Sequence, residues 1–131
     1  MSVKIKFRAW DKDESEMIYD VQNTYDYRCN GSGAYEESFA TVLMDKNRYE
    51  VMQYTGVEDC DGIEIYDKDI TVDDFDLKQW IVISVPGGFG ICPMDYYKET
   101  NGNPPYWTGL SSYENLQWVK YHHHIIGNEY Q

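Results

Sequence analysis

The alternation of apolar and polar residues predicts that this chain folds mainly as β-sheet. Apolar residues occupy every second position from Val3 to Ala9, and lysine or arginine stands between them. Successive side chains of a strand point to opposite faces, so this stretch predicts a strand with one apolar and one cationic face. A polar run over 11–16 then leads into the apolar stretch Met17–Val21. We therefore expect the chain to begin with a β-hairpin.

A second hairpin is predicted over Tyr49–Ile70, the segment around which the rest of the chain is organised. Two alternating runs flank the pair Asp61-Gly62. Asp-Gly suits a two-residue type I′ turn, because glycine has no Cβ and aspartate tolerates a positive φ. The turn of this hairpin is therefore expected at Asp61-Gly62.

Further strands are predicted toward the C-terminus. The β-branched run Gln79–Val85 is typical of a central strand, and Phe89–Cys92 follows Pro86-Gly87-Gly88 as its hairpin partner. An irregular loop is expected over Lys98–Ser112. The last segment, Leu116–Tyr130, is interpreted as a closing strand.

Little helix is expected. A short helix is predicted over Glu36–Met44, where Phe39, Val42 and Leu43 fall three and four residues apart. A helical turn at Tyr113–Asn115, before the closing strand, is left open as an alternative. The interval Gln22–Gly33, which contains Cys29, is polar and reads as a loop. The pattern as a whole predicts a mainly β fold: a small antiparallel, barrel-like sheet with one or two short helices, in a single domain over 1–131.

The charge of the chain excludes one class of function. The net charge is −12, from 11 basic and 23 acidic residues. Such a chain is not expected to bind DNA or RNA directly, because the phosphate backbone repels it. The three cysteines are an odd number without framework spacing, and the longest apolar run, around Ile81–Ile83, is far too short to cross a bilayer. We expect a reduced, cytoplasmic setting and no membrane partner.

Five segments suggest a family. They follow one another in this order across nearly the whole chain: Ile5–Asp11, Met17–Asp20, Tyr49–Gly56, Asp61–Ile70 and Ile125–Tyr130. Together they resemble the YopX family of phage and prophage proteins. One departure is Lys68, which stands where that family usually has glycine. The resemblance implies a small, mostly β, self-associating, phage-encoded protein, active in the cytoplasm of the bacterial host, and supplies no catalytic residues.

The sequence offers no convincing metal or catalytic motif. Asp59-x-Asp61-Gly62 fails as a calcium loop, because Val57 and Lys68 would stand where the loop needs carboxylates. The run His122–His124 lacks a close partner pair such as Cys-x-x-Cys, so zinc is not expected.

No cofactor and no catalytic residue are predicted, and the protein is expected not to be an enzyme. Cys60 and Cys92 are interpreted as small core residues. A pairing of Cys92 with His124 is left open as a less favoured alternative.

Acidic residues are concentrated in the middle of the chain, where the segment from Asp45 to Asp76 holds eleven acids and three bases. One hypothesis is that this segment forms a face that imitates DNA and occupies the nucleic-acid-binding surface of a bacterial defence protein. The alternative is a solvated face that serves solubility alone. The candidate partner-binding residues are Glu58, Asp59, Asp61, Glu64, Asp67, Asp69, Asp73, Asp74 and Asp76.

Aromatic residues support a further alternative. The 13 tyrosines and 4 tryptophans are numerous enough to leave aromatic surface for self-association, which predicts a homo-oligomer. Pockets lined by such rings could sequester a nucleotide signal of bacterial immunity by stacking on its base. The candidate ligand-binding residues are Tyr106, Trp107 and Trp118.

Overall fold

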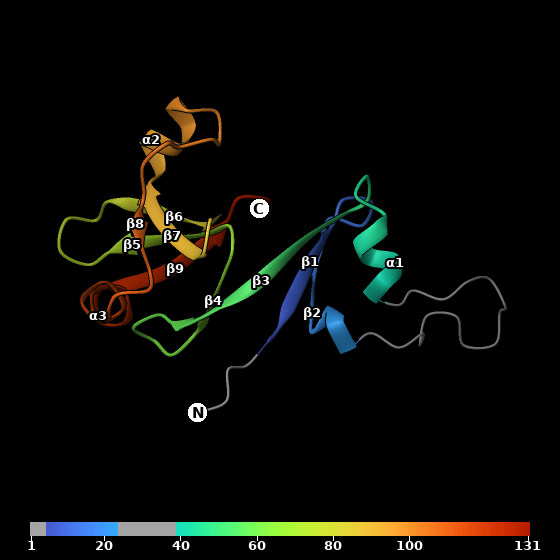
Figure 1. Cartoon of the computed structure of the whole chain (residues 1–131), viewed down its shortest axis with the longest axis horizontal. Helices are drawn as coiled ribbons and strands as arrows, with labels where there is room; N and C mark the ends of the chain where they lie inside the picture. The colour runs from blue at the N-terminus through green and yellow to red at the C-terminus, as the bar shows by residue number, and fades with distance from the viewer. Residues whose placement is uncertain (1–4, 24–38) are drawn as a thin grey trace, which may run out of the picture. The chain divides into compact units, whose positions relative to one another are not determined.

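The computed structural model describes residues 5–23 and 39–131, and the chain forms two compact units, Met1–Gln53 and Tyr54–Gln131 (Figure 1). The predicted mainly β class is confirmed. The described residues contain nine strands, all paired antiparallel, and three α-helices where one or two helices were predicted. The single domain over 1–131 stays a prediction.

The first unit begins with the predicted hairpin. Strands β1 (Phe7–Asp11) and β2 (Glu16–Tyr19) pair antiparallel, and β1 also pairs with the first part of β3 (Tyr49–Glu58). The predicted helix is present as α1 (Phe39–Met44), and its expected first turn, 36–38, lies outside the described residues. A 3-10 turn, Val21–Asn23, occupies the start of the predicted loop, whose remainder, including Cys29, also lies outside them.

A small apolar cluster holds the first unit together. Ala9, Val21, Val42 and Tyr49 are buried in it, and Phe39 of α1 packs against the same cluster. One buried charge lies at the end of β1: both oxygens of Asp11 accept hydrogen bonds from the Arg48 side chain, each at 3.0 Å. A bidentate contact of this kind fixes the Arg48 side chain as well as neutralising the carboxylate.

The second unit contains a curled five-stranded sheet. Its strand order is β8-β7-β6-β5-β9, and the second part of β3 pairs separately with β4. The bounds are β4 (Glu64–Tyr66), β5 (Asp69–Asp73), β6 (Gln79–Val85), β7 (Gly88–Pro93), β8 (Thr108–Gly109) and β9 (His123–Asn128). The predicted central strand and its hairpin partner, β6 and β7, are confirmed.

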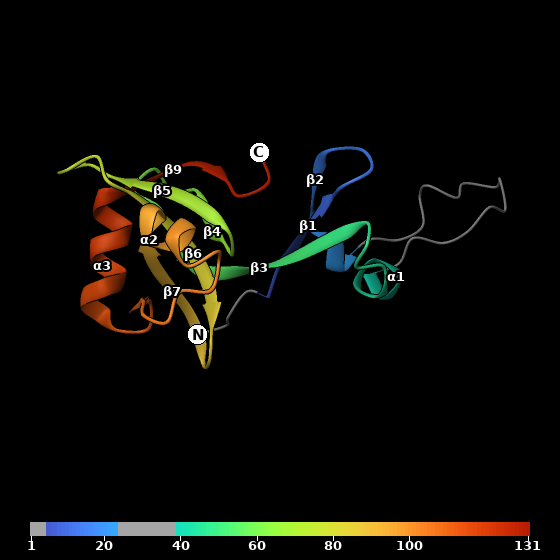
Figure 2. The same cartoon turned by 90° about the horizontal axis from the view of Figure 1, so that it is seen from above.

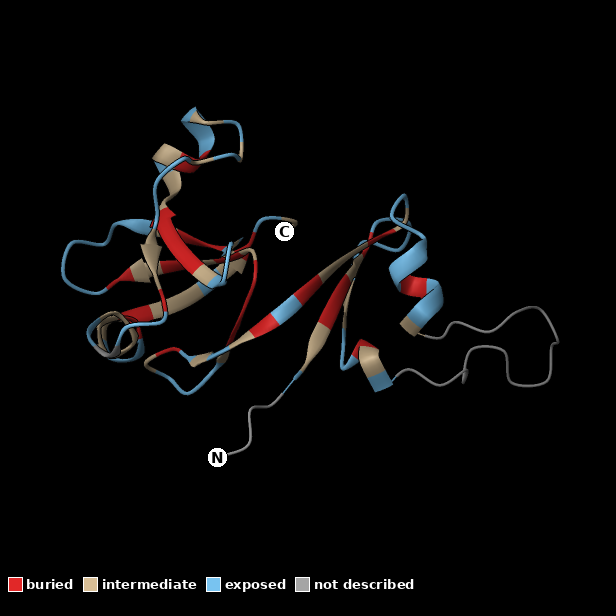
Figure 3. Cartoon of the chain, viewed as in Figure 1, coloured by how far each residue is buried: buried red, intermediate tan, exposed pale blue. Residues whose placement is uncertain are grey.

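Both faces of this sheet are covered by a helix (Figures 1 and 2). Val82 and Ile91 pack on Val119 of α3 (Tyr113–His122). The alternate residues, Ile81 and Cys92, pack on Tyr97 of α2 (Met94–Glu99). These two apolar faces explain why the sequence of β6 is a continuous apolar run, and the central residues of β6 and β7 are buried (Figure 3).

Strand β5 differs, because its buried side chains are polar. Asp69, Thr71 and Asp73 are buried, and Ile70 and Val72 between them are half-buried. The hydroxyl of Thr71 lies 2.8 Å from Nδ1 of the buried His123 on the neighbouring strand β9. The side chains of Asp69, Thr71 and Asp73 therefore each have a specific polar partner. The partners of the two aspartates are described below.

The prediction of a closing strand over Leu116–Tyr130 is wrong for its first half. Residues up to His122 belong to α3, and only His123–Asn128 form a strand. The helix begins after Ser112, whose hydroxyl accepts a hydrogen bond from the backbone N–H of Asn115 at 3.2 Å, a typical N-cap. Within the described ranges, no helix has the length and apolar character needed to cross a membrane.

Candidate functional site

A buried aspartate organises the loop between β3 and β4. One oxygen of Asp59 accepts the backbone N–H groups of Asp61 and Ile63, each at 2.9 Å, and the other accepts the N–H of Ile125 at 3.0 Å. The predicted two-residue type I′ turn is wrong: the loop spans five residues, and Gly62, with a φ of 78°, has the positive φ that the turn would also require at Asp61. Because Ile125 belongs to β9, Asp59 ties this loop to that strand.

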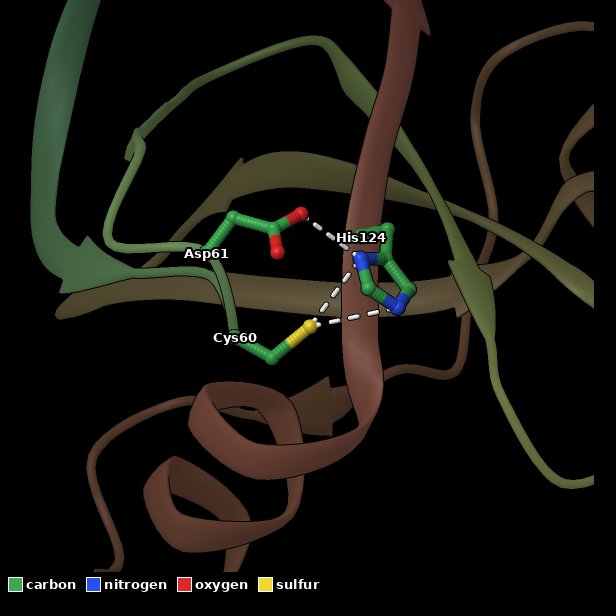
Figure 4. Close-up of side chains that lie close together, drawn as sticks. All are labelled: Cys60, Asp61 and His124. Atoms are coloured by element: carbon green, nitrogen blue, oxygen red, sulfur yellow. Dashed lines mark hydrogen bonds and ion pairs between the residues drawn. The ribbon is translucent and has the colours of Figure 1, made fainter.

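The tied loop brings a cysteine and a carboxylate to a histidine of β9 (Figure 4). The Sγ atom of Cys60 lies 3.0 Å from Nδ1 and 3.3 Å from Nε2 of His124. One carboxylate oxygen of Asp61, Oδ2, lies 2.8 Å from the same Nδ1. The backbone N–H of Cys60 donates to the carbonyl of His123 at 3.0 Å, so main chain as well as side chains fix this approach.

A second loop completes the surroundings of His124. An oxygen of Asp74 lies 2.6 Å from its Nε2, and the backbone N–H of Asp74 donates to the carbonyl of His122 at 2.8 Å. The buried Asp73 shapes this loop, because it accepts the N–H of Phe75 at 2.9 Å and the indole N–H of Trp118 at 3.2 Å. His124 is thus held between two carboxylates and a thiol.

The electrostatics of this cluster do not favour a nucleophilic cysteine. Burial raises the pKa of Cys60, and the charges of Asp61, Asp74 and Asp59 raise it further. The hydrogen bond to Asp61 raises the pKa of His124, and the charges of Asp74 and Asp59 act in the same direction. A catalytic cysteine needs a lowered pKa, because the thiolate is the nucleophile. The surroundings of Cys60 therefore disfavour its thiolate.

The cysteine that contacts His124 is not the one considered from the sequence. Cys92 is buried in the apolar cluster with Ile81, Ile83 and Tyr97, as its prediction as a core residue implies. Cys60 is only half-buried, so the prediction that it is a core residue is wrong. Its partner lies 64 residues along the chain, and no spacing motif signals a contact over such a separation.

The nine acids proposed as partner-binding residues fall into two groups. Four of them are buried and serve as acceptors within the fold. Besides Asp59 and Asp73, Asp69 accepts the backbone N–H of Tyr66 at 2.8 Å, and Asp67 accepts the hydroxyl of Ser84 at 3.1 Å. These four side chains shape turns and are not available to a partner. The remaining five, called the acidic rim below, are exposed or half-exposed: Glu58, Asp61, Glu64, Asp74 and Asp76.

The acids of the rim lie at strand ends and in two loops of the second unit. Glu58 lies opposite Glu64 in the pairing of β3 with β4, and its carboxylate also lies beside Gly62. Asp61, next in the chain to that glycine, shares His124 with Asp74. Asp76 follows two residues later in the loop of Asp74. The fold thus brings Glu58 beside Glu64 and Asp61 beside Asp74, and Asp76 lies two residues further along the loop of Asp74.

The three aromatic residues proposed to bind a ligand do not converge. Trp118 packs edge-on against Trp80, with ring centroids 5.1 Å apart, and against His123 at 4.4 Å. Tyr106 is exposed and lies outside the two clefts that Trp107 lines. These clefts measure about 310 and 280 Å³, and the second is bordered by Lys68. Trp107 therefore lines both clefts, and neither Tyr106 nor Trp118 borders them.

The position of the Trp107 indole depends on Gly90, because a Cβ at that residue would collide with the ring. A Cβ at Gly90 would lie 2.7 Å from Cδ1 of Trp107 and 3.3 Å from the carbonyl oxygen of Thr108. We expect Gly90→Ala to displace the indole and to lower the free energy of unfolding by about 1–3 kcal/mol, as over-packing typically does. Urea unfolding measures the change. Gly127→Ala is the matched control, because nothing lies within 4 Å of its Cβ position, and an equal loss in both variants would contradict the role of this contact.

The fold and site define a small, acidic, mainly β protein with a Cys–His–Asp cluster between a loop and a strand. The chain belongs to the YopX family, whose model matches residues 6–131. Its structure is also similar to the crystal structure of protein EF1440 from Enterococcus faecalis, with 25% sequence identity and a TM-score of 0.57 over 97% of this chain and 94% of that chain. A comparison with curated proteins gives no match.

Proposed function

We propose that this protein is a non-catalytic phage accessory protein that binds a basic, nucleic-acid-binding surface of a host defence protein through the acidic rim. The observation that carries the proposal is that Asp61 and Asp74, from two separate loops, meet at His124, while Glu58 lies opposite Glu64 at the base of the first of these loops. That unit holds 13 acidic residues against four lysines and no arginine. Its field is therefore strongly negative and suits a partner that carries lysine and arginine.

Charge density is the feature that such a surface shares with DNA. Alternate residues of a strand stand about 6.5–7 Å apart, close to the spacing of phosphates along one DNA strand. In this protein the rim charges come from strand ends and two loops, so the likeness is one of charge density rather than of a helical backbone. Association through exposed charges is expected to weaken as salt rises.

The other hypotheses receive less support from the site. A nucleotide sponge needs cations for phosphate groups, and Lys68 is the one lysine that borders the clefts beside Trp107 among the described residues. Self-association stays a proposal, and exposed side chains such as Phe75 and Leu77 supply apolar surface for it. Light scattering of the free protein tests it alongside the experiment below.

The test compares capture of host proteins by two variants of equal net charge. Glu58→Gln, Glu64→Gln and Asp76→Asn together neutralise part of the rim without altering a buried acid. Asp95→Asn, Glu99→Gln and Glu114→Gln remove the same charge from exposed positions outside the rim. We expect the rim variant to capture nucleic-acid-binding proteins about tenfold less well, a difference of about 1.4 kcal/mol, and the control variant to match the native protein.

Competition and salt complete that test. Duplex DNA is expected to displace the captured proteins, and capture is expected to fall sharply between about 0.05 and 0.5 M salt. Equal capture by both variants, or capture that duplex DNA does not reduce, would refute the proposal and leave solubility as the role of the rim.

A further inference from the structure

We propose that Cys60, Asp61 and His124 form a binding site for a divalent metal ion of the zinc class, with Asp74 as the outer carboxylate that orients the imidazole. This site goes beyond partner binding through the acidic rim and does not depend on it. It combines a sulfur, an oxygen and a nitrogen donor, the set from which zinc sites in proteins are built. No spacing motif in the sequence predicts this site, because the three ligands come from a loop and a strand far apart in the chain.

The three donor atoms converge on one point (Figure 4). Nδ1 of His124 lies 3.0 Å from the sulfur of Cys60 and 2.8 Å from Oδ2 of Asp61, and all three atoms lie within 4.8 Å of one another. Ligands of a tetrahedral zinc ion stand about 3.3–3.7 Å apart, because the bonds measure about 2.0–2.3 Å. Both distances to Nδ1 must therefore lengthen by a few tenths of an ångström, which side-chain rotations of the exposed Asp61 and the half-buried Cys60 can supply.

The second nitrogen of the imidazole is already in the position that a metal site requires. Nε2 of His124 lies 2.6 Å from Oδ1 of Asp74, so its N–H donates to that carboxylate when Nδ1 faces the ion. Metal-bound histidines usually donate their other N–H to a carboxylate or carbonyl, which fixes the ring and makes the ligand more basic. Asp74 therefore acts as a positioning residue rather than as a fourth ligand.

The framework beneath the ligands is rigid. The buried carboxylate of Asp59 holds the N–H groups of Asp61 and Ile63 on one side and that of Ile125 in β9 on the other. The N–H of Cys60 is bound to the carbonyl of His123, the residue before the histidine ligand. Both ends of the site are thus fixed relative to each other before any ion binds, which reduces the entropy lost on binding.

Charge and ligand type indicate the class of ion. A thiolate and a carboxylate together neutralise a divalent cation, and the nearby Asp59 and Asp74 make the surroundings still more attractive to it. Thiolate and imidazole ligands favour zinc and chemically similar transition metals over calcium and magnesium, which prefer oxygen. Three protein ligands leave one coordination position of a tetrahedral ion for water or for a group of a partner.

Cobalt(II) is the probe that tests this site, because a cobalt–thiolate bond gives a charge-transfer absorption band in the near ultraviolet. We expect the full-length protein to bind one equivalent with this band, and equimolar zinc to displace the cobalt. Cys60→Ala is expected to abolish the band, whereas Cys92→Ala and Cys29→Ala should retain it. Asp61→Asn and His124→Gln should lose tight binding, and Asp74→Asn should weaken it by about 10–100-fold.

Two outcomes would overturn the proposal: a native protein that shows no thiolate band at micromolar cobalt, or a band that survives in Cys60→Ala. Circular dichroism of each variant shows whether it remains folded, and Cys60→Ser supplies a second, less disruptive variant should Cys60→Ala unfold. The metal site and the proposed function fail independently. The variant of Glu58, Glu64 and Asp76 should still bind cobalt, and Cys60→Ala should still capture partners.

Discussion

Replacing Asp59 by alanine is expected to lower the free energy of unfolding by about 3–5 kcal/mol, because three partly buried backbone N–H groups then lose their acceptor and each costs roughly 1 kcal/mol or more. Urea unfolding followed by tryptophan fluorescence measures the loss, since Trp80, Trp107 and Trp118 all belong to the second unit.

Asp76→Ala is the control for that experiment. Asp76 is an exposed acid of the same region, and its carboxylate accepts the N–H of Lys78 at 2.8 Å. Little change is expected from this variant. If both substitutions lowered the free energy of unfolding equally, the hydrogen bonds that Asp59 accepts from its own loop and from β9 would not be the stabilising feature.

Replacing Arg48 by methionine is expected to destabilise the protein by about 3–5 kcal/mol at pH 7, because the buried Asp11 carboxylate loses its two charged hydrogen bonds. Burial alone would raise the pKa of Asp11, but the hydrogen bonds and charge of Arg48, with the N–H groups of Asp13 and Glu14, lower it. A lowered pKa in the folded state contributes stability above the unfolded pKa, and this contribution is lost as the pH falls through the folded pKa.

The difference between the native protein and Arg48→Met should therefore narrow below about pH 4, the ordinary range of an aspartate pKa. Urea unfolding at several pH values between neutral and strongly acidic measures this. Lys12→Met is the control, because the Lys12–Glu50 pair at 3.1 Å is half-exposed and contributes little. A difference that stays constant down to the lowest pH would show that Arg48 stabilises the fold by packing rather than through Asp11.

Strand positions could be predicted from the sequence wherever one physical rule dominates. The alternation in β1 and the β-branched run in β6 both mark strands that the structure contains. The first half of Leu116–Tyr130 was misread, because its aromatic and β-branched residues fit a strand as well as a buried helix face, and the N-cap at Ser112 was not recognised. Tertiary packing decides such cases.

The buried aspartates show why counting charges along the sequence does not identify the residues of a binding face. Aspartates before tight turns often fold back to accept backbone N–H groups, so Asp59 and Asp73 are structural although the segment reads as uniformly charged. Lys68 illustrates a backbone constraint that its side-chain type does not reveal. Its φ of 70° lies in the left-handed region that glycine adopts at low cost, which explains the glycine that the YopX resemblance leads one to expect there.

The buried polar residues of β5 also specify which neighbours this strand can pair with. Because β6 is apolar on both faces, a slip of one residue between β5 and β6 would still leave apolar side chains buried on each side. A slip of one residue between β5 and β9, in contrast, would separate Thr71 from His123 of β9 and Asp73 from the indole of Trp118, in the helix that leads into β9. Unpaired polar groups in the interior would make that misalignment costly. The polar row thus selects one alignment among several that hydrophobicity alone would tolerate.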